Sequence, residues 1–270
     1  MMSERLPENI GVGPMVWLKP GILAVYGVSL DASEHGHYAI QVGWPRTGSS
    51  CRGSGRPWER PFIITSGVPH ELQMEEGWVL LIEPQTWLGE KLEQHVDNDP
   101  SGALEAPPAR SPLMSEDSDD LVAGLMSLFQ QNGMRECFLR QLQAPSLPGK
   151  IAHPRIRQLL GELDKCLPGV CLKPPQWRAS TVAASLALSE SRFLHLFREQ
   201  MGIAWRPYLL WRRMLCAVGV LTMNGTASEA AHTAGFSDSS HLSRTFRRFF
   251  GLSIRQATHL FVHRKLAHRA

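Results

Sequence analysis

The chain has 270 residues, 43% of them hydrophobic, which is enough material for two domains of roughly 100–200 residues each. Charge divides it: residues 1–150 hold 11 Lys and Arg against 19 Asp and Glu, whereas residues 151–270 hold 17 against 6. A polyanion would therefore be attracted by the C-terminal part and repelled by the N-terminal part, which excludes a uniformly nucleic-acid-binding chain.

Secretion and membrane insertion are also disfavoured. The first residues lack an apolar signal region, and the apolar stretch near residues 78–88 is interrupted by Glu83 and Pro84. The five cysteines form no Cys-x-x-Cys pair. We therefore expect a soluble cytoplasmic protein with reduced thiols and no membrane partner.

The N-terminal part is predicted to be β-rich. Its β-branched and aromatic residues gather in four short runs, at residues 21–30, 38–44, 61–66 and 78–83. Turn-forming residues separate the runs, and this spacing favours a sandwich or small barrel over helices. We predict a barrel over about residues 12–96.

The composition then changes. Residues 97–120 are rich in proline and acidic residues, so we predict a mobile segment there. Apolar residues at helical spacing next predict a helix over about residues 121–142, which we interpret as a dimerisation element although Gly124 and Gly133 weaken it. Its stripe consists of Leu121, Leu125, Leu128, Phe129, Leu139 and Leu142.

A second helix is predicted over residues 151–165. The prolines and glycine of residues 166–178 cannot continue it and indicate a linker. The predicted domains are thus a sensor and dimerisation domain over residues 1–165 and a DNA-binding domain over residues 179–262.

The last hundred residues contain an internal repeat. Ala183 and Gly202 of the first copy correspond to Ala231 and Gly251 of the second, at offsets of 48 and 49 residues. In each copy a short helix of small residues meets a tight turn, and a second helix follows with apolar residues at helical spacing. This pattern predicts two helix-turn-helix units.

In the second copy, Gly235 permits the turn, Phe236 fills the junction and Asp238 is placed to cap the next helix. The predicted buried stripe of that helix leaves a face of serine and arginine exposed, which suits base edges and phosphates of a major groove. The buried stripe is Leu242, Phe246, Phe249 and Phe250, and the exposed face is Ser239, Ser240, Ser243, Arg244, Arg247 and Arg248.

The first copy follows the same logic. Ser189 is the predicted cap, and the outward residues are Ser191, Arg192, Leu194, His195 and Arg198. Leu194 either contacts a thymine methyl group or is partly buried. A helix over residues 207–221, roughly 22 Å long, connects the two copies and would hold two recognition helices at successive major-groove segments.

Residues 170–262 resemble the DNA-binding domain of AraC/XylS-type transcription regulators. The residues that carry the resemblance are Ser189, Phe197, Gly202, Tyr208-Leu209, Arg213-Met214, Ala217, Leu221, Glu229-Ala230-Ala231, the run from Gly235 to Phe246, and Phe250-Gly251. One departure is that this chain has Ser253-Ile254 and then Ala257-Thr258 where the family usually has Ser-Pro followed by Tyr-Arg after the last motif.

The resemblance implies that both recognition helices enter the major groove. It assigns base reading to Ser191, Leu194, His195, Ser239, Ser240, Ser243 and Arg244, and phosphate contacts to Arg198 and Arg247. It further implies an activator that recruits RNA polymerase, binds double-stranded DNA as a homodimer and responds to a small-molecule effector or a partner.

The N-terminal half more weakly resembles cupin-like sensor domains, through His35-Gly36-His37 and Pro69-His70-Glu71-Leu72. His35, His37 and His70 would be the ligands of a metal. Gln41 stands where metal cupins have a carboxylate, so the sequence favours structural or pocket-lining histidines, with no catalytic residue, no metal and no cofactor.

The sequence thus predicts a multi-domain α+β protein: a β-rich cupin-like barrel with trailing helices, then an all-α double helix-turn-helix. The predicted function is sequence-specific transcription regulation, and we expect no enzyme. The alternative is a metal-dependent cupin enzyme with a DNA-binding tail, but no nucleophile elbow, phosphate loop or His-Glu-x-x-His motif supports catalysis. A purely architectural DNA-binding protein is disfavoured by the acidic first domain.

Overall fold

The structure is a computed structural model that describes residues 15–46, 48–53, 55–96, 101–104, 118–143, 151–165 and 177–262. Within these ranges, none of the helices combines the length and the apolar composition that crossing a bilayer would require.

The N-terminal part forms an antiparallel sheet. Its hydrogen-bonded order is β1-β2-β7-β3-β6-β8, with β4 beside the first half of β7 and β5 beside β4. The strands are β1 (Met15–Lys19), β2 (Ile22–His35), β3 (Ile40–Pro45), β4 (Cys51–Gly53), β5 (Arg56–Pro57), β6 (Phe62–Ile64), β7 (His70–Ile82) and β8 (Ser101–Ala103). The long strands β2 and β7 pair from Ile22 opposite Ile82 to His35 opposite His70.

The predicted barrel is wrong, because the sheet is open. The path ends at β1 on one side and β8 on the other, and the described residues form no pairing between them. A helix, α1 (Trp87–Val96), occupies the end of the range predicted as barrel, and Leu88, Leu92 and Val96 of this helix are buried in one core with the sheet. Covering by helices therefore buries this sheet face without closure of the strands.

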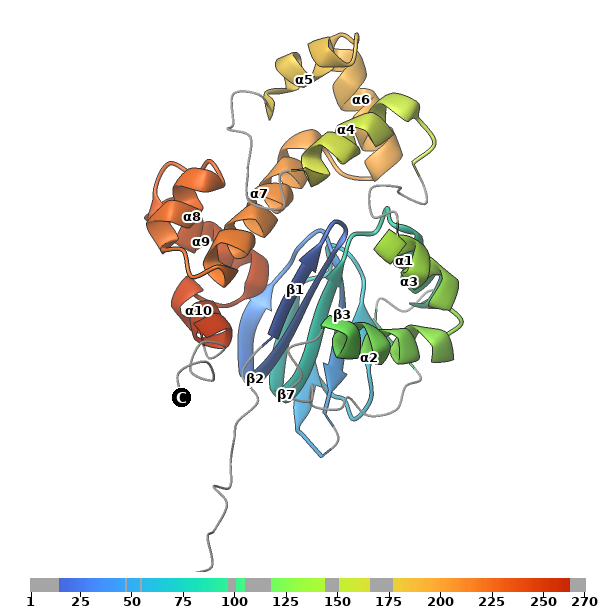
Figure 1. The fold of residues 1–270 in the computed structure, drawn as a ribbon, viewed down its shortest axis with the longest axis vertical. Coiled ribbons are helices and arrows are strands. Elements are labelled where there is room, and N and C mark those ends of the chain that lie inside the picture. The colour runs from blue at the N-terminus through green and yellow to red at the C-terminus, as the bar shows by residue number, and fades with distance from the viewer. Residues whose placement is uncertain are drawn as a thin grey trace, which may run out of the picture.

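Helices α2 (Ser118–Gln131) and α3 (Arg135–Gln143) complete this cover (Figure 1). They replace the single helix predicted over residues 121–142, because Gly133 adopts a positive φ of 69° and turns the chain between them. Leu125, Leu128 and Phe129 are buried in the same core as the sheet. These residues of the stripe therefore pack against the chain's own sheet, and dimerisation through this helix stays a prediction. Of the predicted mobile segment, residues 97–100 and 105–117 lie outside the described residues.

The C-terminal part is helical. It contains α4 (Pro154–Asp164), α5 (Ala179–Ser185), α6 (Glu190–Met201), α7 (Trp205–Thr222), α8 (Ala227–Thr233), α9 (Ser239–Phe250) and α10 (Ile254–Val262). The predicted connecting helix is present as α7, and the closing helix α10 forms despite the departure from the family pattern. The predicted linker falls mostly on residues 166–176, outside the described part.

The second face of the sheet packs on these helices. Leu23 and Leu81 belong to one core with residues of α4 to α10. Figure 1 shows α9 and α10 beside β2, on the side of the sheet away from α1 and α3; α9 contacts β2, and α10 contacts β1. The sheet thus lies between its own helices and the helical C-terminal part.

Candidate functional site

The first helix-turn-helix unit is formed by α5 and α6. The Ser189 side chain accepts a hydrogen bond from the Arg192 amide at 3.3 Å, as predicted for a cap, and Gly202 ends α6 with a φ of 69°. Phe193 and Phe197 are buried under the helix. The predicted contact residues Ser191, Leu194, His195 and Arg198 are all exposed, and Leu194 leaves 37% of its surface to solvent.

The second unit is formed by α8 and α9. Thr226 and Glu229 make a reciprocal capping box at the start of α8. The Asp238 side chain accepts a hydrogen bond from the His241 amide at 2.7 Å, which confirms the predicted cap of α9. This bond, together with the Ser237 hydroxyl, lowers the pKa of the Asp238 carboxyl, so the cap is charged at neutral pH.

The predicted contact residues of α9 differ in exposure. Ser240, Arg244 and Arg247 are exposed, whereas Ser239 and Ser243 are half-buried. The Ser243 hydroxyl donates to the Ser239 carbonyl at 2.7 Å, so its oxygen is left mainly as an acceptor. Arginine therefore supplies the charged donors of this face.

Helix α7 joins the two units into one body, as Figure 1 shows. Its first residue, Trp205, packs edge-on against Phe193 and Phe197 of the first unit, at 5.4 and 5.0 Å between ring centroids. Further along, Arg213 donates to the Ala234 carbonyl at 2.8 Å and to Gly235 at the turn of the second unit. With 18 residues, α7 is about 27 Å long, and the two anchoring residues lie about 12 Å apart along it.

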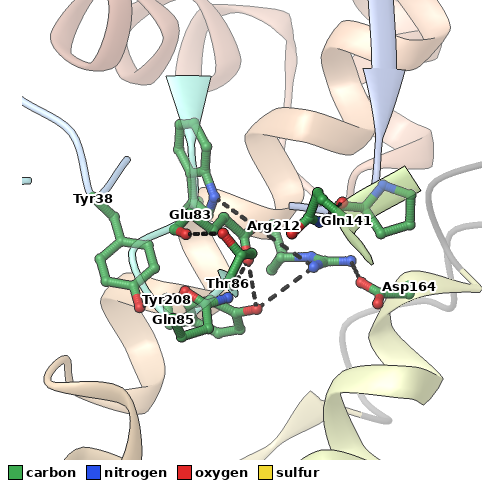
Figure 2. Close-up of polar contacts among 10 residues, drawn as sticks. Tyr38, Glu83, Gln85, Thr86, Gln141, Asp164, Tyr208 and Arg212 are labelled. Atoms are coloured by element: carbon green, nitrogen blue, oxygen red, sulfur yellow. Dashed lines mark hydrogen bonds and ion pairs between the residues drawn. The ribbon is translucent and has the colours of Figure 1, made fainter. Parts of the chain in front are cut away.

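A buried polar network ties α7 to the sheet (Figure 2). Glu83, which directly follows β7 and is only 2% exposed, accepts hydrogen bonds from the Trp211 indole at 2.9 Å and the Tyr208 hydroxyl at 3.3 Å. Arg212 lies 3.6 Å from Glu83 and 2.7 Å from Asp164 of α4. Burial lowers the pKa of Arg212, but Tyr208, Glu83 and Asp164 raise it by more, so the guanidinium keeps its charge.

Sequence reasoning missed this network. Its members are spread over residues 83, 164 and 208–212, so no local spacing links them. The only signal is that Glu83 interrupts an apolar run, and a carboxylate in such a run requires a partner once it is buried.

A second contact joins the sheet to the end of α9. The Ser33 amide and hydroxyl both donate to the Gly251 carbonyl, at 3.2 and 3.0 Å. Gly251 ends α9 with a φ of 66°, and a Cβ atom added there would overlap the Ser33 carbonyl oxygen. Glycine is therefore required both for the conformation and for the approach of strand β2.

The three histidines singled out in the sequence come together beside this contact. His35 and His70 are opposite residues of β2 and β7, and His37 follows two residues after His35. All three are buried, with ring centroids 4.2 to 5.6 Å apart. Burial and the charge of neighbouring His70 lower the pKa of His35 to about 4. The same two causes, together with the charge of His35, lower the pKa of His37 to about 3. The imidazoles are therefore neutral at pH 7.

An apolar cavity of about 80 Å³ lies between the sheet and the C-terminal helices. Leu81 and Val79 line it from the sheet, and Phe246 and Phe250 from α9. Its polar residues are His35 and Gln41, so the cavity reaches the histidine cluster.

Comparison with known proteins matches residues 182–259 to a family described as a helix-turn-helix domain. The probable transcriptional regulator LumQ of Photobacterium leiognathi is 37% identical over 67 residues, which cover 24% of this chain and 27% of LumQ. The match thus spans about a quarter of that relative.

Two solved structures resemble the chain at low sequence identity. ToxT of Vibrio cholerae O395 is 12% identical with a TM-score of 0.47, covering 91% of this chain and all of ToxT. An AraC-type regulator of Chromobacterium violaceum is 22% identical with a TM-score of 0.31, covering 32% of this chain and 79% of its own. From the sequence match and the paired units, the C-terminal region of this chain holds a helix-turn-helix domain.

Proposed function

We propose that the protein is a sequence-specific DNA-binding transcription regulator whose α6 and α9 enter successive major-groove segments of one duplex. The observation that carries this proposal is the attachment of two helix-turn-helix units, each with a capped and exposed recognition helix, to one helix, α7, at Trp205 and Arg213. Such a fixed separation makes the spacing of the two half-sites part of the specificity.

The roles of the predicted contact residues follow from their chemistry. In this proposal Arg244 pairs with a guanine edge, while Arg198 and Arg247 neutralise phosphates. Ser191, Leu194, His195, Ser239, Ser240 and Ser243 supply the remaining base contacts of the two helices. The net positive charge of residues 151–270 strengthens binding to any duplex, and base contacts add the preference for one sequence.

The N-terminal domain controls where the DNA-binding units are held. It contacts α7 through Glu83 and α9 through Ser33, so a change at the sheet reaches both the connecting helix and a recognition helix. A small, mainly apolar effector in the cavity beside Phe246 and Phe250 would favour one arrangement of these contacts. Activation through RNA polymerase and action as a homodimer are proposed from the family resemblance.

The test is selection of genomic DNA fragments on the full-length protein, followed by titration of the enriched duplex at fixed salt. We expect the enriched duplex to bind about 1,000-fold more tightly than a scrambled duplex of equal composition. Equal affinities for the two duplexes would overturn the proposal.

A further inference from the structure

We propose that His35, His37 and His70 bind a divalent first-row transition-metal ion of the Zn²⁺ class through their Nε2 atoms. One ring nitrogen of each residue lies within 4.8 Å of those of the other two, and the three form the only such group among the described His, Cys, Asp and Glu residues. Imidazole nitrogen suits first-row transition metals, and three imidazoles suffice to hold Zn²⁺.

Backbone hydrogen bonds prepare all three rings in the same way. Nδ1 of His35 lies 2.8 Å from the Ser33 carbonyl, Nδ1 of His37 lies 2.9 Å from the Ala39 carbonyl, and Nδ1 of His70 lies 2.8 Å from the Val68 carbonyl. Because a carbonyl only accepts, each Nδ1 must carry the proton. Each neutral ring therefore presents an unprotonated Nε2, which is the form that binds a metal and whose orientation such an outer hydrogen bond fixes.

Two of the three Nε2 atoms, those of His70 and His37, lack the donors that such lone pairs need. Nε2 of His70 is buried with no hydrogen-bond partner. Nε2 of His37 faces Oε1 of Gln41 at 3.3 Å, so two acceptors oppose each other. A cation between them satisfies both, and 3.3 Å is about the distance between two ligand atoms of a tetrahedral ion with bonds of 2.0–2.1 Å. Gln41 Oε1 is then the fourth ligand.

A rotated Gln41 amide is the competing arrangement. After the rotation, the Gln41 Nε2 amide group, which is buried and unpaired as it stands, would donate a hydrogen bond to Nε2 of His37. That rotation satisfies His37 but leaves His70 Nε2 buried without a donor, whereas an ion satisfies both rings. Ligand atoms of a tetrahedral ion lie about 3.3 Å apart, so nitrogens as far apart as 4.8 Å must approach by about 1.5 Å through rotation of the rings.

The ligand set also determines the class of ion. The site offers neutral nitrogens and an amide oxygen, without a carboxylate, so Mg²⁺ and Ca²⁺, which prefer several oxygens, are disfavoured.

The test uses the full-length protein after treatment with a chelator and dialysis. Co²⁺ is titrated as the probe, because its visible absorption reports tetrahedral coordination, and Zn²⁺ is then added in competition. We expect absorption that saturates at one Co²⁺ per chain and is abolished by one Zn²⁺. No saturable absorption, or saturation only with a large excess of Co²⁺, would overturn the site.

Two variants locate the ion. The double variant His35→Ala, His70→Ala should bind Co²⁺ at least about 100-fold more weakly, since even outer-shell changes cost 10–100-fold. His95→Ala, which alters an exposed histidine on α1, is the matched control and should titrate like the wild type. Equal loss in both variants would overturn the assignment.

X-ray absorption of the Zn²⁺-loaded wild type keeps the proposal testable if the double variant does not fold. We expect a shell of nitrogen and oxygen with the outer scattering of three imidazoles, and a sulfur ligand would overturn the proposal. These measurements need no DNA, so their failure is distinguishable from failure of the proposed regulatory function.

Discussion

The Ser33 amide nitrogen lies 3.2 Å from the Gly251 carbonyl oxygen, so an N-terminal strand is hydrogen-bonded to the residue that ends the second recognition helix. The same Ser33 offers its carbonyl to His35. One residue thus connects the sheet, the histidine cluster and the DNA-binding domain.

Replacement of Gly251 by alanine should weaken this contact. Both Gly251 and Gly202 end a recognition helix with a positive φ. A Cβ atom added at residue 202 would meet no atom within 4 Å, whereas one added at residue 251 would lie 2.8 Å from His35 Nδ1 and would overlap Ser33. We expect Gly202→Ala to lower the free energy of unfolding by about 1–2 kcal/mol through backbone strain alone. Gly251→Ala should cost about 1–3 kcal/mol more, because overpacking adds to the strain.

Urea unfolding of the two variants measures this difference, and limited proteolysis shows whether the domains separate. Equal destabilisation by the two substitutions would mean that the contact between strand β2 and α9 contributes nothing to stability.

Glu83→Gln tests the buried network. The amide keeps the shape of the carboxylate but removes the charge that faces Arg212, and breaking a buried ion pair costs about 3–5 kcal/mol. Because Arg212 retains Asp164, we expect the lower end of that range. Lys165→Gln is the control, since its ion pair with Glu162 is exposed and should contribute under about 1 kcal/mol.

Chemical denaturation measures the free energy of unfolding of both variants and so tests the large loss expected for Glu83→Gln against the small loss expected for Lys165→Gln. A loss for Glu83→Gln no larger than that of the exposed control would show that Trp211 and Tyr208, rather than the charge, hold the sheet to α7.

The DNA-binding units could be predicted from the sequence because their determinants are local. The caps Ser189 and Asp238 lie next to the helices they start, and Gly202 and Gly251 lie next to the ends. The duplication repeats these signals at a nearly constant offset, so each unit supports the interpretation of the other.

The sheet was predicted less well because its determinants are distant. The strand predicted at residues 21–30 extends to His35, and the strand predicted at residues 78–83 already begins at His70. Both are longer than predicted because the two strands pair with each other along their full length. The stripe of Leu125 and Phe129 has the same spacing whether it faces a partner chain or the chain's own sheet. Only the tertiary structure shows the latter.

The two arginines of α9 should respond differently to substitution. We expect Arg244→Ala to lose about 1–3 kcal/mol of binding at one base-pair position, because a bidentate contact to guanine is lost there. Arg247→Ala should weaken binding to all duplexes alike and lower the slope of log affinity against log salt by about 1. Anisotropy titrations across single-position operator variants and several salt concentrations separate the effects, and a sequence-blind loss for Arg244→Ala would refute its role as a reader.

Metal binding should protect the contact between Ser33 and Gly251. The ion fixes the His35 ring, whose Nδ1 is held by the Ser33 carbonyl, and the Ser33 amide is itself the donor to Gly251. Hydrogen exchange at this amide requires opening of that bond, so we expect exchange to slow when Zn²⁺ is added at saturation. The amide of Leu23, which lies in the same strand at the far end of the β2–β7 pairing, serves as the internal reference and should change less. Equal exchange of Ser33 with and without Zn²⁺, in protein shown to bind the ion, would mean that the histidine cluster and the recognition helix are not coupled through this residue.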